Sequence, residues 1–71
     1  DNQPILSQLT KREAEIALLV ARGESNKEIA RQLSLAERTI KAHLTVVFEK
    51  LNVRDRLQLA LVLNAPKAPE G

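Results

Sequence analysis

Hydrophobic residues recur at helical spacing along four segments of this chain, between residues 10 and 64. In the first segment, Ile16, Leu19 and Val20 fall on one face, and Gly23 follows the last periodic position. A glycine directly after a periodic run commonly ends a helix. Thr10 followed three residues later by Glu13 has the form of a capping box, in which each side chain bonds the other residue's backbone amide. The pattern therefore predicts a helix that begins at Thr10 and stops at Gly23.

The second and third segments lie close together and differ in length. The second begins at Ser25, which forms another capping box with Glu28, and its apolar face of about two turns consists of Ile29, Ala30 and Leu33. Isolated helices shorter than about 12 residues are marginal, so this helix must pack against its neighbours. After a tight connection, the third helix is expected from about residue 37 to residue 51. Its buried stripe is predicted to be Ile40, Leu44, Val47 and Leu51.

The last segment, residues 55–64, is apolar on two sides. One side can complete the core, and we assign this role to Leu57, Ala60 and Leu61. The other side needs a partner, and we predict a dimer interface at Leu59, Val62 and Leu63. A short helix, a tight turn and a longer helix form a helix-turn-helix, so the predicted fold is all-α, a four-helix bundle containing this motif.

Sequence composition also sets the expected boundaries of the domain. Residues 1–8 are polar with few apolar anchors and are expected to be a linker or a frayed N-terminus. Residues 65–71 contain two prolines and a glycine, which do not extend a helix, so a disordered tail is expected. The domain is therefore predicted to span residues 9–64.

The composition excludes several classes of function. A chain of 71 residues has room for one small core and little room for a deep catalytic cleft. It has no cysteine and one histidine, which excludes disulfides and makes a structural zinc site improbable. His43 has no recognisable nucleophile and orienting carboxylate beside it. We expect a cytoplasmic domain that is not an enzyme, has no cofactor or metal and does not associate with a membrane.

The outward side of the third helix carries residues that can contact DNA bases. If the aliphatic stripe faces inward, the opposite side presents Arg38, Lys41, Ala42 and Thr45. Arginine and lysine donate to guanine, threonine offers a hydroxyl and a methyl group, and alanine permits close approach. An exposed basic face is often only solvated, so this pattern alone leaves both interpretations open.

Polar residues around this face are candidates for contacts to the DNA backbone. Residues 25–56 carry seven basic and four acidic residues, an excess that the flanking segments do not share. For Arg54 and Arg56, the sequence is equally compatible with phosphate contact and with helix capping. For His43, it is equally compatible with phosphate contact and with simple packing. The predicted backbone contacts are Asn26, Lys27, Thr39, His43, Lys50, Arg54 and Arg56.

Several motifs in fixed order resemble one family. The opening LTKRE, the SNKEIA block, the TIKAH block and the closing KLNVRDR, from Leu9 to about Ala60, strongly resemble the LuxR-type (GerE-like) DNA-binding domain of bacterial response regulators and quorum-sensing regulators. The resemblance implies a four-helix helix-turn-helix fold that binds double-stranded DNA, with bases contacted at Lys41, Ala42 and Thr45. It also implies a homodimer on DNA through the last helix and an N-terminal receiver or sensing domain. RNA polymerase is expected as a further partner.

The chain departs from the family pattern at two places. Ala36 stands where these domains usually have a serine cap, and we expect Ser34 to substitute partly by starting the helix earlier. Val46 and Phe48 add apolar surface at positions that are more often polar or tyrosine. An alternative function is therefore a helical protein-interaction module that binds polymerase or a receiver domain through Val46, Phe48 and the last helix.

Overall fold

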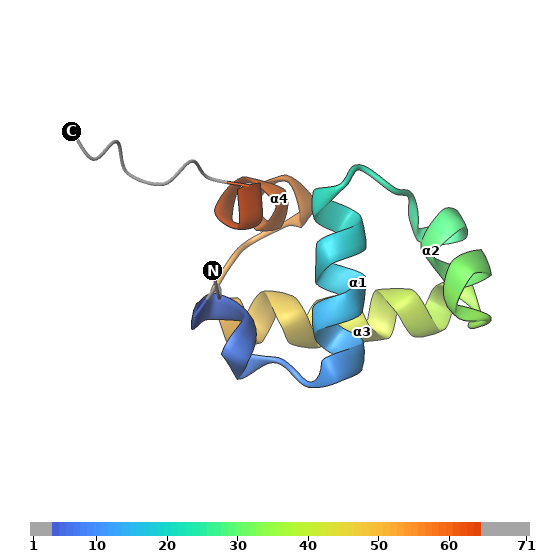
Figure 1. The fold of residues 1–71 in the computed structure, drawn as a ribbon, viewed down its shortest axis with the longest axis horizontal. Coiled ribbons are helices and arrows are strands. Elements are labelled where there is room, and N and C mark those ends of the chain that lie inside the picture. Colours follow the sequence, from blue (N-terminus) through green and yellow to red (C-terminus); the bar gives the residue numbers. More distant parts are fainter. Residues whose placement is uncertain (1–3, 65–71) are drawn as a thin grey trace.

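The computed structural model describes residues 4–64, and these form helices joined by short connections. A 3₁₀ helix, η1 (Pro4–Gln8), precedes four α helices, which are α1 (Lys11–Ala21), α2 (Asn26–Leu33), α3 (Glu37–Leu51) and α4 (Arg56–Asn64). Helix α1 crosses α3, α4 packs against α1, and α2 packs against α3 (Figure 1). The predicted all-α fold with four helices and a helix-turn-helix, formed by α2 and α3, is confirmed.

Reciprocal capping boxes fix the starts of α1 and α2. The Thr10 hydroxyl accepts from the Glu13 amide at 3.2 Å, and Glu13 Oε1 accepts from the Thr10 amide at 3.0 Å. Ser25 and Glu28 repeat this arrangement at 3.1 and 2.8 Å. Each box satisfies backbone amides that have no partner within the helix. The starts of both helices agree with the prediction from the sequence. Gly23 ends the turn after α1 with a φ of 94°, which glycine adopts without steric cost.

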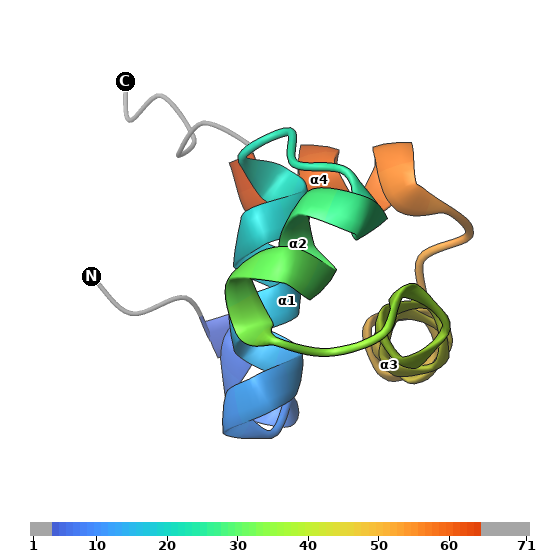
Figure 2. The ribbon, with the colours of Figure 1, turned by 90° about the vertical axis from the view of Figure 1, so that its right-hand side faces the viewer.

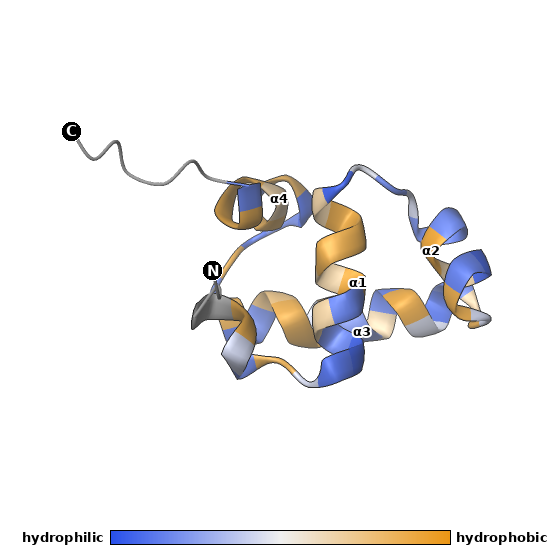
Figure 3. Ribbon diagram, viewed as in Figure 1, coloured by the Kyte–Doolittle hydropathy of each residue, from blue (hydrophilic) through white to orange (hydrophobic). Residues whose placement is uncertain are grey.

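The core is aliphatic and all four α helices contribute to it. Figure 3 shows apolar positions on each of these helices, with polar positions between them. Among the described residues, the largest side chains that are completely buried are Ile16, Ile29, Ile40, Val47 and Leu59. The predicted stripe on α3 is confirmed, because all four of its members are buried. This face holds α3 against the other helices and leaves the opposite face to solvent.

The turn between α2 and α3 differs from the expectation. Ser34 does not start α3 early; it is the C-cap of α2, in the left-handed conformation with φ 59°. The Leu35 amide donates back to the Ala30 carbonyl at 2.9 Å and so closes the end of α2. Helix α3 begins at Glu37, and Ala36 at its N-cap makes no side-chain hydrogen bond. The expected substitute for the missing cap is therefore absent from this turn.

The two sides of α4 are reversed relative to the prediction. Leu59 and Leu63, which were assigned to a dimer interface, are buried in the core. Leu57 and Leu61, which were assigned to the core, are exposed, whereas Val62 is partly exposed as expected. Both sides carry three apolar residues, so periodicity could not choose between them. Arg56 shares the inward face with Leu59 and Leu63 at steps of three and four, and its bonds to the start of α2 orient this face inward.

The start of the described chain is also more ordered than predicted. Residues 4–8 form η1 instead of a linker, and Leu6 packs against the core. The Leu6 carbonyl accepts from the Leu9 amide at 3.1 Å, which joins η1 to the start of α1. The predicted tail, residues 65–71, lies outside the described residues, as do residues 1–3. Within the described part, no helix is both long enough and apolar enough to span a bilayer.

The missing cap at Ala36 leads to a stability prediction. Ala36 has an extended backbone, with φ −78° and ψ 152°, which is the conformation of a serine cap. We expect Ala36→Ser to raise the free energy of unfolding by about 1 kcal/mol, measured by urea denaturation. The same substitution at Ala42, in the exposed middle of α3, should lower it slightly because serine is a poorer helix former. Equal effects at the two positions would contradict the assignment.

Candidate nucleic-acid interface

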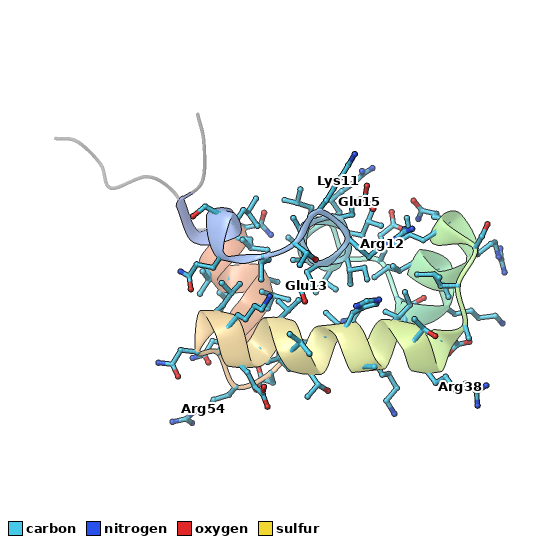
Figure 4. The ribbon with its side chains drawn as sticks, turned by 90° about the horizontal axis from the view of Figure 1, so that it is seen from below. Lys11, Arg12, Glu13, Glu15, Arg38 and Arg54 are labelled. Atoms are coloured by element: carbon cyan, nitrogen blue, oxygen red, sulfur yellow. The ribbon has the colours of Figure 1, made fainter. Side chains whose placement is uncertain are left out.

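The four predicted base-contacting residues lie on the exposed side of α3. Arg38, Lys41, Ala42 and Thr45 are all exposed, whereas the opposite stripe of the helix is buried. Figure 4 shows Arg38 projecting from α3 on the side away from α1, and Arg54 projecting in the same general direction near the other end of α3. With 15 residues, α3 is about 22 Å long. Figure 2 shows α3 end-on at the edge of the molecule.

The hydroxyl of Thr45 is held by its own helix. It donates to the carbonyl of Lys41, four residues earlier, with an oxygen-to-oxygen distance of 3.1 Å. This bond restricts the side-chain torsion of a residue that is already stiff because it is β-branched. The Thr45 hydroxyl therefore keeps an accepting role toward a ligand, and its methyl group is held in one orientation.

Beside this face, residues from α2, α3 and the start of α4 line an open depression of about 260 Å³. It brings together two predicted base contacts, Lys41 and Thr45, with three predicted backbone contacts, Asn26, Arg54 and Arg56. The remaining lining residues are Leu44, Phe48 and Asp55. The cationic and amide side chains provide donors to an anionic group that approaches from solvent, and Asp55 is the one acidic residue among the described lining residues.

Arg56 makes two hydrogen bonds within the protein that the sequence did not indicate. Its Nη1 donates to the side-chain oxygen of Asn26 at 2.6 Å, and its Nη2 donates to the carbonyl of Glu24. The guanidinium is half-buried and connects the start of α4 to the start of α2. Arg54, in contrast, is exposed, and its backbone amide donates to Gln58 Oε1 at 2.7 Å. Arg54 therefore remains a candidate for direct phosphate contact.

Lys50 is oriented away from the predicted interface. Its Nζ lies 2.7 Å from Glu13 Oε1, in an ion pair that joins the C-terminal end of α3 to the first turn of α1. Lys50 follows Lys41 by nine residues, which places it on the opposite side of the helix. Glu13 engages the ammonium group of Lys50 in this arrangement, and the predicted contact of Lys50 to the DNA backbone stays a prediction.

The buried carboxylate of Glu13 is stabilised by two elements at once. Its exposed fraction is 7%, and it accepts both from Lys50 and from the amide of Thr10. The hydrogen bond from Lys50 lowers the pKa of Glu13 below 4.5, the Thr10 amide lowers this pKa further, and desolvation opposes both. The ionised form of Glu13 is therefore the one that holds α1 and α3 together.

The other predicted backbone contacts lie around α2 and α3. Lys27 is exposed in the first turn of α2, and Thr39 and His43 are half-buried on α3. Their contacts to phosphate stay predictions. The sequence interpretation also missed Asp55, whose carboxylate accepts from the Gln58 amide at 2.9 Å and caps α4. The spacing of Asp55 and Gln58 is itself a capping signature, so the sequence contained this signal.

Comparison with known proteins identifies the family. Residues 7–63 match the model of the bacterial regulatory proteins of the luxR family. The chain belongs to this family. It is therefore a helix-turn-helix domain of a family of DNA-binding transcription regulators and not an enzyme, which confirms the resemblance seen in the sequence.

Individual relatives agree with this assignment. The chain is 49% identical over 53 residues to the transcriptional regulatory protein LiaR of Bacillus subtilis, a match that covers 75% of the chain and 25% of LiaR. It is 42% identical over 57 residues to the glycerol metabolism activator of Pseudomonas putida, covering 80% of the chain and 26% of that protein. For the response regulator protein VraR of Staphylococcus aureus the identity is 45% over 53 residues, with 75% and 25% covered. The chain thus spans about a quarter of the length of these curated relatives.

The ion pair between Glu13 and Lys50 leads to a pH prediction. Because the pKa of Glu13 is lowered in the folded state, its contribution to stability is present above about pH 4.5 and is lost as the pH falls through the folded pKa. We expect Glu13→Gln to reduce the free energy of unfolding at pH 7, and the difference from wild type to shrink in acid. Urea denaturation between pH 7 and pH 3 measures this.

Glu15 provides the matched control for that experiment. It is more exposed, and its contact with Arg12 on the surface of α1 is longer, at 3.4 Å. Exposed pairs of this kind contribute little to stability, so Glu15→Gln should leave the unfolding free energy nearly unchanged at both pH values. A pH-independent loss in Glu13→Gln would show that the carboxylate charge is not what holds the two helices.

Proposed function

We propose that this domain binds double-stranded DNA in a sequence-specific manner and serves as the effector domain of a bacterial transcription regulator. The observation that carries the proposal is the division of α3 into a buried aliphatic face and an exposed face with Arg38, Lys41, Ala42 and Thr45. A helix held in this way can enter the major groove without disturbing the core. Membership of the luxR family supports the same function.

Each exposed side chain of α3 has a different part in base recognition. Arg38 and Lys41 donate to guanine O6 and N7, Thr45 accepts through its hydroxyl and packs its methyl group against thymine, and Ala42 lets the helix approach closely. Each good bidentate contact discriminates by about 1 to 3 kcal/mol. One helix with so few contacts has limited specificity, which favours binding as a pair.

The residues around α3 supply affinity that does not depend on sequence. Lys27 and Arg54 are exposed cations at the edges of the interface, and Asn26 lies in the depression next to Lys41. Contacts of lysine and arginine to phosphates release counterions, so binding weakens as salt rises. Thr39 and His43 complete the proposed set of backbone contacts.

We further propose that two domains pair on adjacent half-sites through α4. Leu57 and Leu61 are 68% and 60% exposed on this helix, and Val62 is exposed beside them. The apolar surface needed for pairing is therefore present, although two of its members differ from those that the sequence predicted. Relatives named as response regulators, of which the chain covers about a quarter, support a larger regulatory protein. We propose a receiver or sensing domain as its further part and RNA polymerase as a partner.

The first prediction of this proposal concerns base recognition. Lys41→Ala combined with Thr45→Ala should abolish the preference for a selected DNA sequence while leaving the fold intact, because both side chains are exposed. The preferred sequence is first obtained by selection from a random DNA pool, and affinities for it and for a scrambled duplex are then compared. Circular dichroism checks the fold.

Lys11→Ala is the control for the loss of charge. Lys11 lies on α1 and points away from the outer side of α3 (Figure 4), so its removal should not alter the sequence preference. If the double variant kept its preference for the selected sequence, base recognition by α3 would be disproved. A protein-interaction module that uses Val46 and Phe48 would then be the better interpretation.

The second prediction concerns pairing. On a duplex with two half-sites about one helical turn apart, analytical ultracentrifugation should find two domains per duplex, bound cooperatively. Leu61→Glu should reduce the cooperativity but leave binding to a single half-site unchanged, because a charge replaces exposed apolar surface on α4. One domain per two-site duplex at saturation would contradict the pairing.

A further inference from the structure

The bond between Arg56 and Asn26 connects the start of α4 to the first residue of α2, across 30 positions in the sequence. We propose that Arg56 is a positioning residue, which aims the carboxamide of Asn26 at a DNA phosphate instead of contacting the phosphate itself. The inference rests on the proposed function and assigns a separate task to one of its basic residues.

The chemistry of the two side chains fixes the orientation of the amide. A guanidinium has only donors, so it must face the oxygen of the Asn26 carboxamide and not its nitrogen. The 2.6 Å contact to Oδ1 and the second bond to the Glu24 carbonyl hold the guanidinium plane from two sides. Asn26 Nδ2 therefore points away from Arg56, and it donates to no acceptor within residues 4–64.

The Asn26 side chain is located where a phosphate would meet it. Asn26 lines the same open depression as Lys41 and Thr45, which belong to the proposed base-reading face. Phosphate oxygens only accept hydrogen bonds, so an amide with its N–H groups directed outward is the useful rotamer. A carboxamide turned the other way would present an oxygen to the phosphate and repel it.

Arg56 itself is poorly placed for direct contact. It is half-buried, whereas Arg54 nearby is exposed, and two of its five N–H groups already donate within the protein. Its two bonds to the start of α2 hold the guanidinium against the protein, whereas within the described chain no such bond holds the Arg54 side chain. Holding a donor in its bound orientation lowers the entropy cost of binding, which is the benefit that Arg56 provides.

The experiment is a double-mutant cycle on the selected duplex with a substitution that conserves charge. Lysine retains the positive charge of Arg56 but not its planar fork. We expect Arg56→Lys and Asn26→Ala each to raise Kd about tenfold, the effect of losing one hydrogen bond to a charged group. The double variant should bind no more weakly than Asn26→Ala alone. The slope of log affinity against log salt should be the same for Arg56→Lys as for wild type, since no ionic contact is lost.

Arg54 gives the matched control for a direct contact. Arg54→Lys should change Kd little, and its effect should add to that of Asn26→Ala. Arg54→Gln should reduce the salt slope by about 0.9, the loss of one neutralised phosphate. If Arg56→Lys bound DNA with near-normal affinity, or if its effect added to that of Asn26→Ala, the positioning role would be overturned. The proposed function would still stand.

A second variant separates positioning from folding. Asn26→Asp keeps an oxygen for Arg56 to bind, so the unfolding midpoint in the absence of DNA should be retained, but it removes both N–H donors. DNA affinity should fall at least as far as in Asn26→Ala. Wild-type affinity in Asn26→Asp would overturn the inference even if Arg56→Lys failed to fold. If the wild-type domain bound no duplex at all, the proposed function would fail first, and this inference with it.

Discussion

Burial of one aliphatic face of α3 is the interaction on which the rest of the structure depends. Ile40 and Val47 are completely buried, and Leu44 and Leu51 nearly so. Each such side chain contributes about 1.5 to 3 kcal/mol when it leaves water. The hydrophobic effect has no direction, however, so burial alone permits small rotations and shifts of the helix. Polar contacts at the helix ends restrict these, including the ion pair between Lys50 and Glu13.

Much of the fold could be predicted from local patterns. The starts of α1 and α2 follow from capping boxes within four residues, and the length of α3 follows from its apolar stripe. The orientation of α4 could not be predicted in this way, because both of its sides are apolar and long-range bonds, among them those of Arg56 and Asn64, distinguish them. Ser34 was assigned wrongly for a related reason, since a short polar residue suits both a helix start and a left-handed helix end.

The candidate site was predictable to a similar extent. The helical periodicity of α3 identified its exposed residues correctly, because one buried stripe determines which residues lie on the opposite, exposed side. It did not show that Lys50 binds Glu13, since the two residues are separated by 37 positions and no local spacing relates them. The same limit applies to Arg56 and Asn26, which were each recognised as polar candidates but not as partners. Sequence patterns thus located the surface, and tertiary contacts determined which side chains remain available on it.

The separation of the two faces of α3 has a consequence for how such domains diversify. Arg38, Lys41 and Ala42 make no contribution to the buried core, so exchanging them alters the exposed face of the helix with little penalty in folding. Under the proposed function, duplicated copies of a gene acquire new operator preferences by a few substitutions on one scaffold, without passing through unstable intermediates.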